Sequence, residues 1–242
     1  TASLENPDGY GRVIRRQSGG SQQGGPASSE VLKIVEDRDA APAEQAVKEI
    51  NVGTYVVSGG FLFPALEKLE PQNAQGEYYL TDIVRMAVAQ GQRVVAVTLQ
   101  DPDEGLGVNT RQQLAAAERV VRQQARERWL DEGVTMLDPG SVWIDAGVTI
   151  GKDTVLSPNV TLEGKTEVGE DCLLRSYSRL TDCRLGNRVE ILDHCVLSES
   201  QIDDDATVGP FVHLRPGVVI RRAAKVGNFV EMKKTELGEG SK

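Results

Sequence analysis

The sequence predicts an α/β domain, one connecting helix and a parallel β-helix, in that order along 242 residues. Up to residue 109, apolar segments with strand composition alternate with segments whose apolar residues have helical spacing, which is typical of an α/β layer. From Ile144 onward, an Ile, Leu, Val or Met recurs every five or six residues. Neither a helix nor an alternating strand has that period, whereas a β-helix of hexapeptide repeats does.

The composition narrows the class of protein. The net charge is −9 and the isoelectric point is about 4.9, which argues against a broad nucleic-acid surface because such a surface is basic. No apolar run approaches the ~20 residues that a membrane-spanning helix needs. The three cysteines have neither CxxC nor zinc spacing and indicate reduced thiols in a cytoplasm. We therefore expect a cytoplasmic globular protein with no nucleic-acid or membrane partner.

The first 109 residues are expected to form the α/β domain. INVGTYVV (50–57) and RVVAVTL (93–99) are predicted as buried strands, and GFLFPALEKL (60–69) and TDIVRMAVAQ (81–90) as helices between them. This alternation predicts a largely parallel sheet. The Gly, Ser and Gln-rich segment SGGSQQGGPASSE (18–30) is predicted to be a long flexible surface loop.

Residues 110–131 are predicted to form one exposed connecting helix between domains. Leu114, Val121, Ala125 and Trp129 lie along one helical face among Arg, Glu and Gln residues. Gly133 is predicted to mark the C-terminal end of this helix.

The repeat after residue 144 is unusually regular. Thirteen of its sixteen intervals are six residues long and three are five residues long. The repeated apolar residues are at positions 144, 150, 156, 162, 168, 174, 180, 185, 191, 197, 202, 208, 214, 220, 226, 232 and 237. The fifth position of each hexad carries a small residue such as Val, Thr, Cys, Ser or Ala, as expected beside a large inward side chain in a narrow triangular coil. Three hexads are expected to form one coil of about 18 residues.

The end of the sequence suggests an interrupted repeat. The last hexad begins at Leu237 and carries no polar cap, so its coil would expose an unpaired strand edge and an open apolar end. We therefore expect the chain to be a fragment.

Several motifs together resemble one enzyme family. They are GYGR (9–12), IVEDRDA (34–40), EINVGTYV (49–56), NAQGEYYLTD (73–82), GVNTRQQL (107–114), GPFVHLRPG (209–217) and VGNFVEMKKTELGEGS (226–241). They resemble the bacterial bifunctional N-acetylglucosamine-1-phosphate uridylyltransferase and glucosamine-1-phosphate N-acetyltransferase. The resemblance covers nearly the whole chain apart from the 18–30 segment.

The resemblance implies a fold and a division into domains. It implies part of a Rossmann-like α/β nucleotidyltransferase domain over residues 1–111, a linker helix over 112–132 and a left-handed parallel β-helix over 133–242.

The resemblance also implies an activity. The whole family enzyme makes UDP-N-acetylglucosamine from UTP and acetyl-CoA with Mg²⁺, as a homotrimer. No segment here matches the family's glycine-rich nucleotide loop or its catalytic lysine, and its general-base histidine would lie beyond Lys242. No catalytic residue is therefore assigned, and we expect this chain to be inactive alone.

Asn109 matches the metal-binding asparagine of the family. A lone carboxamide is chemically adequate because Mg²⁺ takes one or two protein oxygens and keeps several waters. The alternative is structural, since Asn109 with Gln112 also fits a helix N-cap with a capping-box partner.

Gly11, Glu36 and Asn51 match the family's contacts to N-acetylglucosamine. A glycine lets a backbone amide approach the sugar, while a carboxylate and a carboxamide can bind its hydroxyl and N-acetyl groups. Without the motifs, Gly11 would be interpreted as a turn residue, Glu36 as a solvated charge and Asn51 as a polar residue at a strand end. Tyr78 and Tyr79 are assigned no role and are interpreted as packing groups.

Arg215 and Lys233 are predicted to bind a phosphate, and the repeat supports this independently of the family. They occupy the second position of hexads 18 residues apart, so they should stack with backbones about 4.8 Å apart. Adjacent like charges repel unless an anion lies between them. The earlier residues of that column are Ser198, Thr181, Glu163 and Asp145, so only its C-terminal end is basic. The alternative is a pair of solvated cations that splay apart.

Other reactive side chains are given structural roles. His194 and His213 lie beside inward positions and match no catalytic histidine, while Cys172 and Cys195 occupy small inward positions and are expected to be buried thiols. Glu231 and Lys234 are equally consistent with a supporting role at the phosphate site and with solubility.

Two alternatives stay open for the whole chain. One is a related sugar-nucleotide pyrophosphorylase with a β-helix, and the other is a non-catalytic trimerisation module.

Overall fold

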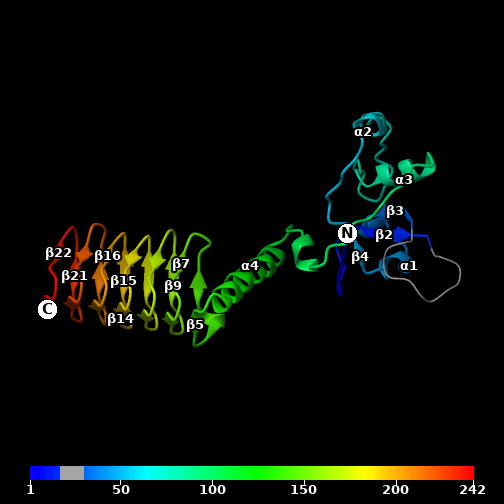
Figure 1. Ribbon diagram of the computed structural model, residues 1–242. Helices are drawn as coiled ribbons and strands as arrows, with labels where there is room; N and C mark the ends of the chain where they lie inside the picture. Colours follow the sequence, from blue (N-terminus) through cyan, green and yellow to red (C-terminus); the bar gives the residue numbers. More distant parts are fainter. Residues whose placement is uncertain (17–29) are drawn as a thin grey trace. The chain divides into compact units, whose positions relative to one another are not determined.

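The computed structural model describes residues 1–16 and 30–242, so the loop predicted at 18–30 lies outside the described residues except for Glu30. The chain forms two compact units, Thr1–Ala117 and Glu118–Lys242, each with its own hydrophobic core. Figure 1 shows the elements of both units.

The first unit combines a small sheet with short helices. Its four strands are ordered β1-β4-β2-β3, and every pair is antiparallel. The strands are β1 (Ala2–Ser3), β2 (Arg12–Arg15), β3 (Val31–Val35) and β4 (Glu49–Ile50). The helices are α1 (Pro42–Gln45), α2 (Gly59–Leu66) and α3 (Asp82–Ala89), with 3-10 turns η1 (Asp37–Asp39) and η2 (Pro102–Gly105). Helix α3 packs against β3 through Ile83 and Val84, which form a core with Val13, Val31 and Ala65.

The helices predicted around 60–69 and 81–90 are confirmed, but the parallel sheet is wrong for the described chain. Of the first predicted strand (50–57), only Ile50 is in a ladder, as part of β4, and 93–99 forms no strand. Apolar composition alone does not make a strand, which needs a neighbour for its backbone groups. Near Leu99 that neighbour is a single residue: Leu99 donates to the Thr1 carbonyl, and the Thr1 ammonium donates to Val97. Val56, in the first predicted strand, is fully exposed.

The predicted connecting helix is present as α4 (Arg111–Asp131). It ends as predicted at Gly133, whose φ is +93°, because the Gly133 and Val134 amides donate to the carbonyls of Leu130 and Trp129. The helix is exposed over most of its length, as predicted, and Leu114 and Val121 are more than half exposed. Only Trp129 is buried, because only the last turn packs into the core of the second unit.

The second unit is a parallel β-helix whose short strands stack into three sheets, with the 3-10 turn η3 (Pro139–Ser141) between its first two strands. Figure 1 shows the coils stacked in chain order from β5 beside α4 to β22 near the C-terminus. One sheet holds β5 (Thr135–Met136), β8 (Val155–Leu156), β11 (Leu173–Leu174), β14 (Glu190–Ile191), β17 (Thr207–Val208) and β20 (Lys225–Val226). The next holds β6 (Trp143–Ile144), β9 (Thr161–Glu163), β12 (Arg179–Thr181), β15 (Val196–Ser198), β18 (His213–Leu214) and β21 (Glu231–Met232). The third holds β7 (Thr149–Ile150), β10 (Glu167–Val168), β13 (Arg184–Leu185), β16 (Gln201–Ile202), β19 (Val219–Ile220) and β22 (Glu236–Leu237).

The hexapeptide interpretation is confirmed by burial and by register. Every repeated apolar residue from Ile144 to Val226 is buried, and Met232 and Leu237 pack against the same core. Equivalent residues pair across neighbouring coils, as Leu162 does with Leu180 and Leu197 with Leu214. The small residues at the fifth positions are buried beside them from Val148 to Ala224. Among the helices of the described residues, none is long and apolar enough to cross a membrane.

Candidate functional site

The first unit brings together the three residues predicted to contact a sugar. Gly11 lies immediately before β2, Glu36 follows β3, and Asn51 follows β4. The Asn51 amide donates a hydrogen bond of 2.8 Å to the Gly11 carbonyl. A methyl group placed on Gly11 would lie 3.3 Å from a Glu36 carboxylate oxygen, so a larger residue would crowd that carboxylate. Three strand ends therefore converge on one polar site.

Thr81 belongs to this site and was not predicted. Its buried hydroxyl donates a hydrogen bond of 2.8 Å to Oε1 of Glu36. Thr81 stands at the N-terminus of α3, where a hydroxyl normally caps the helix, yet its side chain makes no capping hydrogen bond. In the sequence, Thr81 only begins a segment predicted to be helical (81–90), so the sequence offered no signal for the bond to Glu36.

An apolar cleft of about 760 Å³ opens beside Asn51. Its walls include Tyr55, whose hydroxyl is buried without a hydrogen-bond partner among the described residues. Burial raises the pKa of Tyr55, the nearby Asn51 side chain lowers this pKa, and the charge of Glu36 raises it. Tyr55 therefore presents a neutral polar group close to two of the predicted sugar contacts.

Asn109 is exposed, and it is not the N-cap of α4, which was the alternative interpretation of this residue. The residue that caps α4 is Thr110, whose hydroxyl accepts from the Gln113 amide at 3.1 Å. The Gln113 side-chain oxygen accepts in turn from the amides of Thr110 and Asn109. The predicted partner Gln112 takes no part because the cap lies one residue later. The carboxamide of Asn109 makes no hydrogen bond within the described part of the chain.

The fit of Asn109 to a magnesium ion follows from its chemistry. Its carboxamide oxygen is a hard neutral donor, and Mg²⁺ binds through one or two protein oxygens while keeping water and phosphate ligands. The described residues contain no group of three or more His, Cys, Asp or Glu side chains that could hold a metal without a substrate. Asn109 thus fits a Mg²⁺ ion that binds together with a substrate phosphate.

The second unit stacks Arg215 and Lys233 as predicted. His213 pairs with Glu231 and Leu214 with Met232, so Arg215 and Lys233 continue the same parallel register. The Arg215 amide also donates to the Met232 carbonyl at 2.9 Å.

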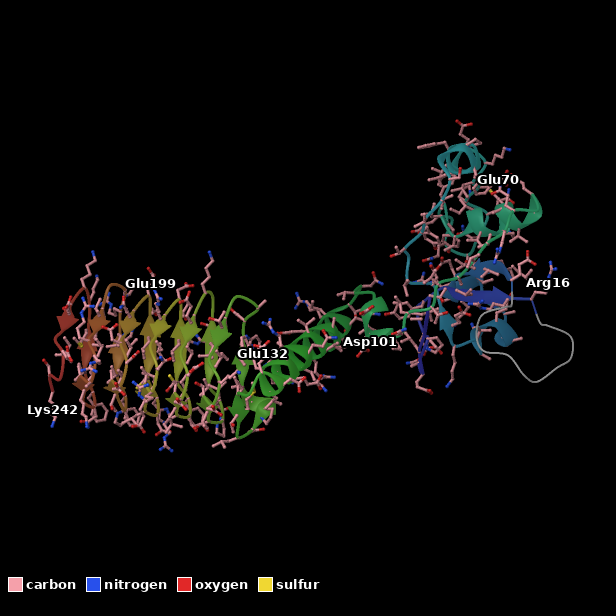
Figure 2. All side chains as sticks on the ribbon, viewed as in Figure 1. Arg16, Glu70, Asp101, Glu132, Glu199 and Lys242 are labelled. Atoms are coloured by element: carbon pink, nitrogen blue, oxygen red, sulfur yellow. The ribbon has the colours of Figure 1, made fainter. Side chains whose placement is uncertain are left out.

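A carboxylate modifies this basic pair. The Arg215 guanidinium lies 3.1 Å from Glu231, and both side chains are largely exposed. Within residues 1–16 and 30–242, Lys233 forms no ion pair. Glu231 therefore reduces the repulsion between Arg215 and Lys233, a role that was expected of a bound anion. Figure 2 shows the side chains that project outward along the coils between Glu132 and Lys242.

A column of aromatic rings at one corner of the β-helix was missed. Tyr177, His194, Phe211 and Phe229 stack with ring centroids 4.9, 4.9 and 5.2 Å apart. All four residues have φ between +55° and +62°, a conformation in which side chains are rare. The sequence signal is their spacing of one coil, which becomes meaningful once the corners are located. His194 is a stacking residue here.

The cysteines are buried, as expected for Cys172 and Cys195. Burial raises the pKa of all three thiols, that of Cys183 to about 11. The Cys172 thiol donates to the Gly186 carbonyl at 3.1 Å. They are structural groups of the β-helix core.

No model of a known protein family matches the chain. Individual proteins do match over all of its 242 residues. Proteins named bifunctional protein GlmU are 45% identical in Pelobacter propionicus, 44% in Heliobacterium modesticaldum and 46% in Streptococcus agalactiae. Each alignment covers the whole chain and 50% of the relative.

Solved structures give a much weaker likeness. A perosamine N-acetyltransferase mutant from Caulobacter crescentus, in complex with CoA and GDP-perosamine, is 14% identical over 46% of this chain and 60% of its own, with a TM-score of 0.28. That value is too low to support any inference about this chain. The identities of 44–46% extend across all 242 residues, although the chain spans only about half the length of the curated relatives it matches. Over its whole length, the chain is therefore similar to about half of the bifunctional proteins named GlmU.

Proposed function

We propose that this chain carries parts of two ligand sites for the synthesis of UDP-N-acetylglucosamine. The first unit contributes to N-acetylglucosamine-1-phosphate uridylyltransferase, and the β-helix contributes to glucosamine-1-phosphate N-acetyltransferase. The observation that carries the proposal is the convergence of Gly11, Glu36 and Asn51, which come from three separate strand ends. The identity of 43–46% to bifunctional proteins across the chain supports both halves and argues against a pyrophosphorylase of another type.

In uridylyl transfer, a phosphate oxygen of N-acetylglucosamine-1-phosphate attacks the α-phosphorus of UTP, and pyrophosphate leaves. Glu36 accepts hydrogen bonds from sugar hydroxyls, and Asn51 and the Gly11 backbone orient the N-acetyl end. Thr81 occupies one Glu36 oxygen and so presents the other to the sugar. Asn109 would hold Mg²⁺, which when bound neutralises negative charge on the phosphates.

In acetyl transfer, the amine of glucosamine-1-phosphate attacks the thioester of acetyl-CoA, and the CoA thiolate leaves. Arg215 and Lys233 hold the sugar phosphate, because a guanidinium fork and an ammonium one coil apart can share its oxygens. Glu231 competes with that phosphate for Arg215. Neither the glycine-rich loop nor the histidine segment of the family occurs in these residues, so for this chain alone we expect binding without turnover.

Assembly and location complete the proposal. A homotrimer formed through the β-helices and a bacterial cytoplasm fit a pathway whose substrates are UTP and acetyl-CoA. The runner-up function is a trimerisation module without ligand sites, which predicts assembly but no binding of sugar nucleotides.

Calorimetric titration of UDP-N-acetylglucosamine into the chain tests the first site. Replacing Glu36→Gln removes the charge at the convergence point, and a charged hydrogen bond of about 1.5–3 kcal/mol corresponds to a loss of about 10- to 100-fold in affinity. The exposed Glu70 provides the control, and Glu70→Gln should leave affinity unchanged. Equal affinities for all three proteins would contradict the sugar site.

Titration of glucosamine-1-phosphate tests the second site. We expect Lys233→Ala to weaken binding about 10-fold or more, and Lys165→Ala, at an exposed corner of another coil, to have no effect. Binding that responds equally to both substitutions would indicate non-specific attraction to surface cations.

A further inference from the structure

Tyr10 lies between a tight turn and the first sugar contact. Its amide donates to the Pro7 carbonyl at 3.2 Å across a turn in which Gly9 has a φ of +81°. The next residue is Gly11, whose carbonyl accepts the amide of Asn51. The Tyr10 carbonyl accepts from the guanidinium of Arg12, which is buried and paired with Asp37 at 3.0 Å. The backbone that leads into Gly11 is thus fixed without any help from the tyrosine ring.

The Tyr10 side chain reaches a segment 97 residues away. Its hydroxyl accepts from the Gly107 amide at 3.1 Å and donates toward the Gly107 carbonyl at 3.3 Å. The ring packs on the same glycine, since a methyl group on Gly107 would lie 3.4 Å from Cε1 of Tyr10. One phenol therefore satisfies both backbone groups of Gly107, in a part-buried setting where unpaired groups are costly.

Gly107 is two residues from the exposed Asn109. On the other side of Asn109, the Gln113 oxygen binds the amides of Asn109 and Thr110 at 2.8 and 2.9 Å. The backbone of residues 107–110 is thus held at both ends, by Tyr10 and by the cap of α4. Between these anchors, the Asn109 carboxamide engages no hydrogen-bond partner that the described residues supply.

We propose that Tyr10 is a positioning residue that sets the metal ligand Asn109 at a fixed place relative to the sugar contact Gly11. The inference rests on the proposed uridylyltransferase site and adds the coupling between its two parts. The sugar and the metal-bound phosphate belong to one ligand, so a shift of about 1 Å between their contacts weakens joint binding. Loss of the Tyr10 hydroxyl releases Gly107 and hence Asn109, while Arg12 and Asn51 still hold Gly11.

The test is binding of UDP-N-acetylglucosamine with and without Mg²⁺ to four proteins: the unmodified chain, Tyr10→Phe, Asn109→Ala and the double variant. Tyr10→Phe removes one oxygen and keeps the ring on Gly107, and circular dichroism checks that the fold is retained. We expect Tyr10→Phe to weaken binding about 3- to 10-fold with Mg²⁺ and less than about 2-fold without it. In the Asn109→Ala background it should have no further effect. Tyr78→Phe, whose side chain is 68% exposed, is the matched control.

The outcomes separate the inference from the proposed function. If Tyr10→Phe weakens binding equally with and without Mg²⁺, its role is merely structural and the coupling is refuted while the sugar site stands. If the unmodified chain binds no UDP-N-acetylglucosamine, or binds it without any Mg²⁺ dependence, the proposed metal–sugar site fails and the inference fails with it. Amide hydrogen exchange at Gly107 gives a ligand-independent check, since its rate should rise in Tyr10→Phe and an unchanged rate would refute the anchor.

Discussion

Replacing Leu197 by alanine probes the packing on which the phosphate pair depends. Leu197 lies in β15, is fully buried, and pairs in register with Leu180 in β12 and Leu214 in β18. Leu214 immediately precedes Arg215, so this column of leucines forms the inner side of the strands that present the proposed phosphate ligands. The Leu197→Ala substitution therefore removes contacts with the coil above and the coil below.

The magnitude follows from the complete burial of the side chain. Leu→Ala removes three carbon atoms, and at about 0.8 kcal/mol for each buried CH₂ the transfer cost alone is about 2.4 kcal/mol. A cavity between coils adds to this, because a parallel ladder fixed on both sides cannot collapse onto the gap. We expect the free energy of unfolding of the β-helix to fall by about 3–4 kcal/mol.

Tryptophan fluorescence during urea titration measures this loss in the β-helix unit specifically. The sequence has two tryptophans, Trp129 and Trp143, and both lie in the unit Glu118–Lys242. Trp129 is buried in the core, and Trp143 packs under the Arg122 guanidinium at 3.5 Å. Val196→Ala, which is 41% exposed on the same strand, is the control and should cost less than about 1 kcal/mol. A loss below about 1 kcal/mol for Leu197→Ala, or equal losses for both variants, would refute the assignment of inward and outward positions.

Two further predictions concern single polar atoms. Thr81→Val removes the hydroxyl that binds Glu36, and we expect the affinity for UDP-N-acetylglucosamine, measured by calorimetry, to fall about 3- to 10-fold. Thr81→Ser keeps a hydroxyl and should retain most of the affinity. An undiminished affinity in Thr81→Val would show that Glu36 does not need this hydrogen bond. Burial raises the pKa of the Cys183 thiol from 9.0 to about 11, so the unfolded protein loses this proton at a lower pH than the folded protein does. The stability that the neutral thiol contributes is therefore complete below pH 9 and is lost as the pH rises toward 11. Urea titrations between pH 8 and 10.5 should show a smaller loss in Cys183→Ala than in the unmodified chain, and parallel profiles would contradict the raised pKa.

The accuracy of the sequence predictions differed between the two units for a physical reason. In the β-helix each coil contacts only its neighbours, so a local repeat such as Leu162, Leu180 and Leu197 already specifies which residues meet. In the first unit, strand pairing joins residues far apart in sequence, and the apolar composition of 93–99 could not reveal that it lacks a ladder in the described chain. Helix positions were predictable there because 3.6-residue spacing is a local property.

By itself, the sequence determined the coil repeat, the inward column of apolar residues and the stacking of Arg215 with Lys233, since all three follow from spacing along one strand direction. Through motifs it also identified Gly11, Glu36 and Asn51 as candidate sugar contacts and Asn109 as a candidate metal ligand, without giving the contacts that join them. The structure decided that Thr110 caps α4 in place of Asn109, because Asn109 with Gln112 and Thr110 with Gln113 both have capping-box spacing and the sequence does not show which oxygen reaches which amide.

The same holds for the contacts between distant segments. The bonds of Thr81 to Glu36 and of Tyr10 to Gly107 span 45 and 97 residues. Hydrogen bonds require atoms within about 3 Å, and such proximity arises only when the chain has folded and packed.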